Sequence, residues 1–185
     1  ASIGLLLQSL TASALAVSIS IDWPANLAVT CESDPPGKID LVISVTGLEE
    51  GVIDTKTTFF CPGHYRFGNR VYRCWKKGGH GSVDILKAVE ESCDVFFYQV
   101  GQRLGVDRLA FYARAAGLGS PTGIFLDQEA RGLIPTAAWK KRRQGISWQK
   151  GETLSVVIGQ GFNLATPLQM AMVVAAVGNG GTRYR

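Results

Sequence analysis

Charged residues are absent from the first 21 positions of this chain, and no Cys-x-x-Cys pair, internal repeat or low-complexity segment occurs anywhere in it. The uncharged stretch, Ala1 to Ile21, has the length of a membrane span. Five serines, one threonine and one glutamine interrupt it, however, and no basic residues precede its apolar part, as they would in a signal peptide. We therefore expect buried strands or helix here. The sequence begins at alanine, and we expect it to be a piece of a longer protein.

Charge is also sparse over the whole chain. Of its 185 residues, 18% are charged and 46% are hydrophobic, which is an ordinary globular composition and excludes a disordered tail. The net charge of +4 weakly favours anionic partners. Much of it comes from the run Lys140 to Arg143, which has no interleaved aromatic residues. We expect this run to be a solvated loop, and we expect no nucleic-acid partner.

Helix caps occur three times between residues 82 and 117. Ser82 is placed to cap a first helix, Asp94 a second and Asp107 a third, which runs from Arg108 to Ala116. Glycines close the second and third helices, at Gly105 and Gly117. The apolar positions of the first helix recur at helical spacing and are Val83, Leu86, Val89 and Cys93.

The last third of the chain predicts a strand followed by a helix. Thr153 to Ile158 is rich in β-branched residues, which favours a buried strand. Thr166 is followed by Pro167, and a cap residue before a proline at the first helical position marks a helix start. That helix runs over Leu168 to Val177 and ends at glycine. Earlier in the chain, Val42 to Val45 fits a strand or a helix equally well.

The motif Ser92-Cys93-Asp94 places a hydroxyl and a carboxylate two residues apart between two predicted helices. Taken alone, such residues are ordinary caps. The motif also resembles the Ser-x-Asn or Ser-x-Asp motif of class B penicillin-binding proteins, the enzymes that cross-link peptidoglycan. Further segments resemble the elongation-type members of that class, the penicillin-binding protein 2 family, in the same order. They are Thr57 to Phe60, Tyr72 to Lys77, His80-Gly81, Glu90 to Ser92, Phe96 to Val100, Thr122 to Ile124, Ile158 to Gly161 and Ala165 to Met170.

The resemblance implies an α/β (α+β) fold, in which an antiparallel sheet is packed with helices beside an all-helical subdomain that carries Ser92. We expect residues 47–185 to be a partial transpeptidase domain of this fold. Residues 1–46 resemble the family only weakly. We interpret them as a remnant of the first strand and of the nucleophile region.

The penicillin-recognising site combines three motifs. A serine nucleophile has a lysine one helical turn later, so that the amine lies beside the hydroxyl; a second serine and a Lys-Thr-Gly strand complete the site. By resemblance, Ser92 is the second serine and would relay protons, while Asp94 would hydrogen-bond the neighbouring lysine or the substrate. Lys-Thr-Gly is absent from this chain, and Lys38 to Leu41 follows Pro35-Pro36-Gly37 where the family has Ser-Thr-x-Lys.

One Ser-x-x-Lys spacing does occur, at Ser147 to Lys150. It lies in a basic, glycine-flanked stretch without helical periodicity, whereas the acylation chemistry requires a buried helix start. We interpret it as a chance match. By its own residues, the chain therefore lacks the acylation centre.

The resemblance implies that the parent enzyme is a peptidoglycan D,D-transpeptidase of cell elongation, acting through an acyl-serine intermediate, and that this chain alone is inactive. The implied partners are peptidoglycan stem peptides, β-lactam antibiotics and a glycosyltransferase of the elongation machinery. The implied location is the periplasmic face of the inner membrane, with an anchor outside this chain. A non-catalytic scaffold or binding module of the same fold, and a serine β-lactamase or β-lactam sensor, stay open as alternatives.

The chain contains four cysteines and two histidines. Three thiolates and one imidazole form a complete tetrahedral zinc set, for which the candidates are Cys61, Cys74, His80 and Cys93. Some elongation-type members are similar in holding a zinc at these positions, with aspartate where this chain has cysteine. A Cys61–Cys74 disulfide, buried free thiols, and His64 in place of His80 are the competing interpretations. We expect one structural zinc and no organic cofactor.

Overall fold

The computed structural model describes residues 2–4, 20–22, 39–124 and 129–183. The helices are α1 (Ile39–Glu49), α2 (Ile85–Glu90), α3 (Asp94–Leu104), α4 (Val106–Ala115), α5 (Ala137–Gln144), α6 (Lys150–Val157) and α7 (Pro167–Gly178). The strands are β1 (Ser2–Gly4), β2 (Ser20–Asp22), β3 (Phe59–Cys61), β4 (His64–Phe67), β5 (Arg70–Arg73) and β6 (Gly81–Val83). Among the described helices, none has both the length and the apolar character that crossing a membrane requires.

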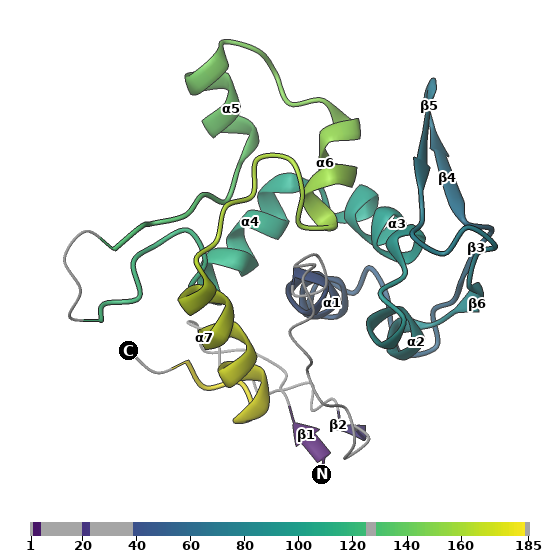
Figure 1. Ribbon diagram of the computed structural model, residues 1–185, viewed down its shortest axis with the longest axis horizontal. Helices are drawn as coiled ribbons and strands as arrows, with labels where there is room; N and C mark the ends of the chain where they lie inside the picture. Colours follow the sequence, from purple (N-terminus) through teal and green to yellow (C-terminus); the bar gives the residue numbers. More distant parts are fainter. Residues whose placement is uncertain (1, 5–19, 23–38, 125–128, 184–185) are drawn as a thin grey trace.

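The strands form antiparallel pairs, β1 with β2, β3 with β6, and β4 with β5. Strands β3 to β6 gather on one side of α3, and α4 to α7 lie on the other (Figure 1). This mixture of helices and short antiparallel sheets agrees with the expected fold class. Most of the uncharged stretch at the start of the chain, Cys31 and the Pro35-Pro36-Gly37 turn lie outside the described residues.

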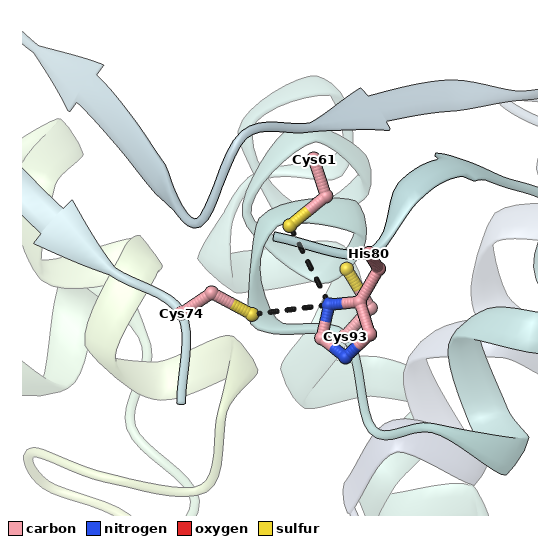
Figure 2. A group of neighbouring side chains, drawn as sticks. All are labelled: Cys61, Cys74, His80 and Cys93. Atoms are coloured by element: carbon pink, nitrogen blue, oxygen red, sulfur yellow. Dashed lines mark hydrogen bonds between the residues drawn. The ribbon is translucent and has the colours of Figure 1, made fainter. Parts of the chain in front are cut away.

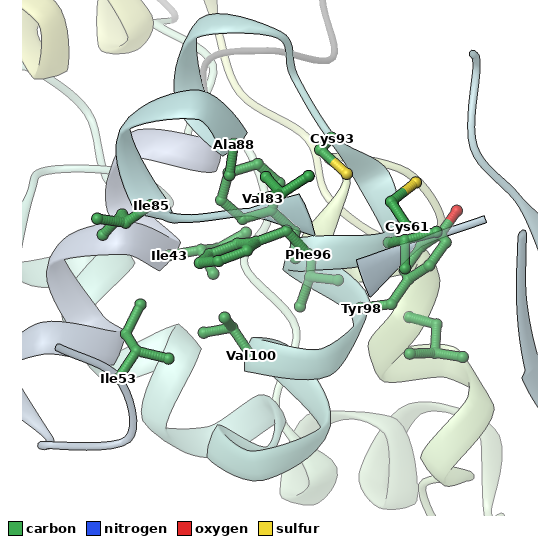
Figure 3. Close-up of a cluster of buried hydrophobic side chains, with 14 of the residues drawn as sticks. Ile43, Ile53, Cys61, Val83, Ile85, Ala88, Cys93, Phe96, Tyr98 and Val100 are labelled. Carbon is green, nitrogen blue, oxygen red and sulfur yellow. The ribbon is translucent and has the colours of Figure 1, made fainter. Parts of the chain in front are cut away.

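Helix α3 is the centre of the main hydrophobic core. Its residues Phe96, Phe97 and Val100 are almost completely buried, and side chains from α1, α2, β3 and β6 surround them (Figure 3). The Phe59 and Phe96 rings pack with their centroids 5.1 Å apart. Because α3 follows Ser92 and Cys93 directly, this core fixes the position of the motif.

Helices α3 and α6 approach each other closely at Gly101. A Cβ atom at this position would collide with the Val157 side chain, so only glycine allows the two backbones to come this close. A second apolar cluster joins α1, α4 and α7 and consists of Val42, Ala110, Ala113, Leu118, Ile134 and Val173.

The strand predicted over Thr153 to Ile158 is wrong, because these residues belong mainly to α6. A capping box starts the helix: Gln149 receives a hydrogen bond from the helix backbone, and the Glu152 side chain accepts one from the Gln149 backbone. Leu154 and Val157 then bury their side chains against α3. Tertiary packing and the cap thus override the β propensity of the segment.

The solvated loop predicted over Lys140 to Arg143 is also wrong, because the run lies in α5 behind a Thr136 cap. The Lys140 side chain is only 2% exposed. Its ammonium pairs with the Glu152 carboxylate and lies 5.9 Å from the centre of the Trp148 ring. The other three basic residues of the run are exposed, as expected.

The predicted cap residues differ from the observed ones at three helices. Ser82 lies in β6, and Asp84 caps α2 instead. Asp94 is the first residue of α3, after Cys93 at the cap position, and Gly105 stands before α4, which Asp107 therefore does not start. The Asp107 carboxylate instead accepts a hydrogen bond from the Ala137 amide, at 2.9 Å.

Other local predictions are confirmed. Gly105 ends α3, and α7 begins at Pro167 behind a capping box formed by Thr166 and Gln169. Val42 to Val45, left open between strand and helix, lies in α1.

Candidate functional site

Three thiols and one imidazole meet beside the start of α3. Cys61 is the last residue of β3, Cys74 follows β5, His80 precedes β6, and Cys93 is the cap residue of α3. All four side chains are buried, and their ligand atoms lie within 4.8 Å of one another (Figure 2). No two of them share a helix or strand, so the tertiary fold brings them together.

The spacing of these atoms fits a bound zinc ion. His80 Nδ1 lies 3.5 Å from Cys61 Sγ and 3.5 Å from Cys74 Sγ. A tetrahedral zinc with Zn–S bonds of about 2.3 Å and Zn–N bonds of about 2.0–2.1 Å separates its sulfur and nitrogen ligands by roughly 3.5 Å. Both of these sulfur–nitrogen distances therefore match the separation that zinc requires.

The His80 ring is oriented for ligation through Nδ1. Its other nitrogen, Nε2, is buried without a hydrogen-bond partner and lies 3.6 Å from the Glu91 carboxylate. A carboxylate behind a ligand histidine is the usual way in which proteins fix its orientation and tautomer. Burial lowers the pKa of His80, which favours the neutral imidazole that a metal binds.

The surroundings of Cys93 and Cys74 favour their protonated thiols. Burial raises the pKa of Cys93, and the neighbouring Cys61 and Cys74 raise it further. Burial likewise raises the pKa of Cys74. A divalent cation would reverse this preference because it stabilises thiolates, and its binding would release protons.

Two glycines make the close approach of the strands possible. Gly63 and Gly79 have φ angles of +88° and +77°, in the left-handed region that favours glycine. A Cβ at Gly79 would collide with the Cys61 carbonyl, and one at Gly63 with the Lys77 carbonyl. The Cys74 amide donates to the Gly63 carbonyl at 2.9 Å, which closes the loop around the thiols.

The structure also bears on the competing interpretations. His64 is exposed on β4 and is not part of the cluster. Cys61, Cys74 and Cys93 are free thiols, so there is no Cys61–Cys74 disulfide.

Ser92 adopts a strained conformation at the joint between α2 and α3. Its φ of +47° is the only positive value at a non-glycine residue in the described part of the chain. Such a conformation costs about 1–3 kcal/mol and persists only where surrounding contacts hold it. The Ser92 hydroxyl donates to the Asp40 carboxylate at 3.0 Å.

Trp75 makes further contacts with this joint. Its backbone amide donates to the Asp94 carboxylate at 2.9 Å, and its indole Nε1 lies 3.0 Å from the carbonyl oxygens of Glu91 and of Ser92. Burial raises the pKa of the half-buried Asp94, and the Trp75 hydrogen bond opposes that rise. No motif in the sequence marks an individual role for Trp75, although it directly follows Cys74.

Asp40 was also missed as a site residue. It is buried in the first turn of α1, and burial raises its pKa to about 8. No motif marks this aspartate, but it lies just after the turn where the resemblance places the nucleophile. By contrast, Ser147 is exposed in the loop before α6 and Lys150 is exposed at the first position of that helix, so neither lies at a buried helix start.

Comparisons with known proteins show the family of this chain. A family model described as the penicillin binding protein transpeptidase domain matches residues 38–185. The peptidoglycan D,D-transpeptidase MrdA of Salmonella typhimurium strain LT2 is 43% identical over 153 residues, which are 80% of this chain and 24% of that protein. The chain thus spans about a quarter of the length of this relative.

Solved structures show the same relationship. The complex of penicillin-binding protein PBP2 with MreC from Helicobacter pylori matches with a TM-score of 0.74 and 36% identity, over 77% of this chain and 27% of the matched one. A peptidoglycan synthase complex, solved for the coordination of polymerization and crosslinking, matches with a TM-score of 0.74 and 41% identity, over 82% and 26%. The chain belongs to the penicillin-binding protein transpeptidase domain family.

Proposed function

We propose that this chain is part of a peptidoglycan D,D-transpeptidase and supplies the second-serine motif of its active site. In the complete enzyme, a nucleophilic serine would attack the D-Ala-D-Ala bond of one stem peptide, and an amine of a neighbouring stem would release the acyl-enzyme. Residues 47–185 would form the partial domain, with residues 1–46 as the weakly recognised segment before it. The family match over residues 38–185 supports the partial domain.

The observation that carries the proposal is the geometry of the α2–α3 joint. Ser92 projects its hydroxyl toward the start of α1, the helix that follows the sequence Pro35-Pro36-Gly37. In the family, the nucleophile comes directly after this turn, so its hydroxyl and lysine would lie within reach of Ser92. Ser92 would then relay a proton, while Asp94, held by Trp75, would hydrogen-bond the lysine or the substrate.

We also propose that Cys61, Cys74, His80 and Cys93 hold one structural zinc ion. The ion would link the β4–β5 hairpin and the flanking strands β3 and β6 to Cys93, the cap residue of α3. Its chemistry would be structural: it holds four donors in one arrangement and leaves no position for substrate. The close spacing of the donors and the Glu91 carboxylate behind His80 support this assignment.

The partners and location of the parent enzyme are part of the proposal. Its substrates would be peptidoglycan stem peptides, its inhibitors β-lactams, and its partner a glycosyltransferase of the elongation machinery. A relative solved within a peptidoglycan synthase complex that coordinates polymerization and crosslinking supports such a partner. The domain would work at the periplasmic face of the inner membrane, held by an anchor outside the described helices.

A second candidate, a non-catalytic scaffold module, is favoured by one observation. Asp40 occupies the first turn of α1, and its carboxylate receives the Ser92 hydroxyl that would otherwise serve the nucleophile and its lysine. Such a pair keeps the joint intact without acylation chemistry.

A chimera separates the two candidates. Residues 47–183 of this chain would replace the matching segment of the Salmonella typhimurium relative. The relative would supply the sequence on both sides of this segment. Those flanking regions are where the family carries its nucleophile and its Lys-Thr-Gly strand. We expect the chimera to be acylated by a fluorescent penicillin. Loss of its general acid–base relay in a Ser92→Ala chimera should slow acylation by about 100-fold.

A Ser147→Ala chimera is the matched control, because Ser147 is exposed and is not part of the α2–α3 joint, and it should acylate at the unchanged rate. A folded chimera that takes no penicillin, or a Ser92→Ala chimera that acylates normally, would contradict the transpeptidase proposal. The first of these results would favour the scaffold.

A further inference from the structure

Trp75 joins two parts of the site that are otherwise separate. It follows Cys74 in the chain, and its indole ring packs edge-on against the His80 ring, with the ring centres 5.4 Å apart. Its indole N–H donates to the Ser92 and Glu91 carbonyl oxygens, and its backbone N–H donates to the Asp94 carboxylate. One residue thus touches both the metal-ligand cluster and the motif.

These contacts hold Trp75 although it is largely exposed. The residue is 64% exposed, so burial does little to restrict its side chain. Its orientation depends instead on the His80 ring and on the hydrogen bonds to the joint. Whatever fixes His80 and Cys74 therefore also fixes Trp75.

Trp75 in turn contacts the strained residue. Ser92 has a left-handed backbone that an L-amino acid adopts only where its surroundings require it. The indole N–H reaches the Glu91 and Ser92 carbonyls, which lie on either side of the Ser92 φ torsion. A single donor shared by these two oxygens restricts that torsion.

We infer that Trp75 is a positioning residue that couples the thiol–imidazole cluster to Ser92 and Asp94. Metal binding to the cluster orders Trp75, and Trp75 holds Ser92 in its left-handed conformation and Asp94 at the start of α3. This inference rests on the proposed metal site. It concerns the conformation of Ser92 and is independent of whether the parent enzyme transfers acyl groups.

The test is nuclear magnetic resonance on this 185-residue chain. Trp148 gives an internal control, because its indole Nε1 donates to Thr153 Oγ1 at 2.9 Å and it lies outside the cluster. Zinc added to the chelator-treated protein should slow exchange of the Trp75 indole proton by about tenfold, since ordering suppresses local opening, and leave that of Trp148 unchanged.

The Trp75→Phe variant removes the indole N–H and keeps an aromatic ring at an exposed position. In the zinc-loaded variant, the Ser92 carbon chemical shifts should move away from left-handed values while zinc stoichiometry stays the same. A Trp148→Phe variant should leave the Ser92 shifts in place. This signature separates positioning from a general effect on stability, which would not move the Ser92 shifts selectively.

Two results would overturn the inference: bound zinc that leaves the Trp75 indole exchange unchanged, or Trp75→Phe that leaves the Ser92 shifts unchanged. Zinc content is measured on the same samples. A protein that binds no zinc would contradict the proposed metal site, and this result is distinct from the two above. A chimera that takes no penicillin has no bearing on these spectra.

Discussion

The Ser92 hydroxyl donates a hydrogen bond to the Asp40 carboxylate at 3.0 Å, which joins the α2–α3 joint to the first turn of α1. The two residues are 52 positions apart in the chain. Asp40 is buried, and Asp94 lies near enough to raise its pKa further. The contact therefore places a proton-binding group next to the motif serine.

This pair makes stability depend on pH. Burial raises the pKa of Asp40 from 3.8 to about 8 in the folded chain, whereas the unfolded chain keeps the ordinary value. Between these values the folded state binds the extra proton, so the contribution of Asp40 to stability is present at low pH and is lost as the pH rises toward 8. Asp40→Asn keeps a polar partner for Ser92 without a titrating group. Chemical unfolding from pH 5 to 8 should show a weaker loss of stability in this variant, and parallel profiles would contradict the assignment.

The backbone of Ser92 gives a second prediction. Ser92→Gly and Ser92→Ala both remove the hydrogen bond to Asp40, but only alanine keeps the Cβ at a positive φ. The glycine variant should be more stable than the alanine variant by about 1 kcal/mol in urea unfolding. If alanine is the more stable of the two, the left-handed conformation of Ser92 is wrong.

The metal site gives a third prediction. The purified chain should bind one zinc per molecule, and a chelator should lower its melting temperature because binding stabilises only the folded state. Cys93→Ser should weaken binding at least about 100-fold. Glu91→Gln removes the carboxylate charge behind His80 but keeps all four ligands, so it should weaken binding by roughly 10–100-fold.

The control for this series is His64→Ala, because His64 is exposed and outside the cluster. It should bind zinc with unchanged affinity in a competition assay with a chromogenic chelator. Loss of zinc in this variant would show that the ligand set includes His64.

The contact between α3 and α6 gives a fourth prediction. Gly101→Ala places a methyl group against Val157 and should destabilise the chain by about 1–3 kcal/mol. Val157→Ala makes room and should recover part of that loss in the double variant, so the two changes should not be additive. Strict additivity in thermal unfolding would contradict the close approach.

Some of the structure could be predicted from local sequence because local interactions decide it. The start of α7 follows from Thr166 and Pro167, and the end of α3 follows from Gly105. Helix α6 could not be predicted in this way. Its β-branched residues favour a strand, and its helical state depends on the Gln149 cap and on burial of Leu154 against α3, which lies far away in sequence.

In the candidate site as well, some residues could be predicted from the sequence and others could not. Its thiols and imidazole were recognised by their chemistry, although only the fold shows that Cys61 and Cys93 meet. Asp40 and Trp75 were not predicted, because their roles come from contacts with Ser92 that no sequence spacing encodes. Lys140 was assigned to solvent because a basic run is usually exposed, but its pairing with the half-buried Glu152 reverses that expectation for this one residue.

The most direct test of the account is the intact mass of this chain after incubation with a penicillin. Because the chain carries the Ser92 motif without the acylation centre, we expect no penicillin adduct on the chain alone. An adduct that disappears in Ser147→Ala would contradict the account and identify Ser147 as a nucleophile. An adduct that persists in that variant would contradict it as well and place the nucleophile at another serine.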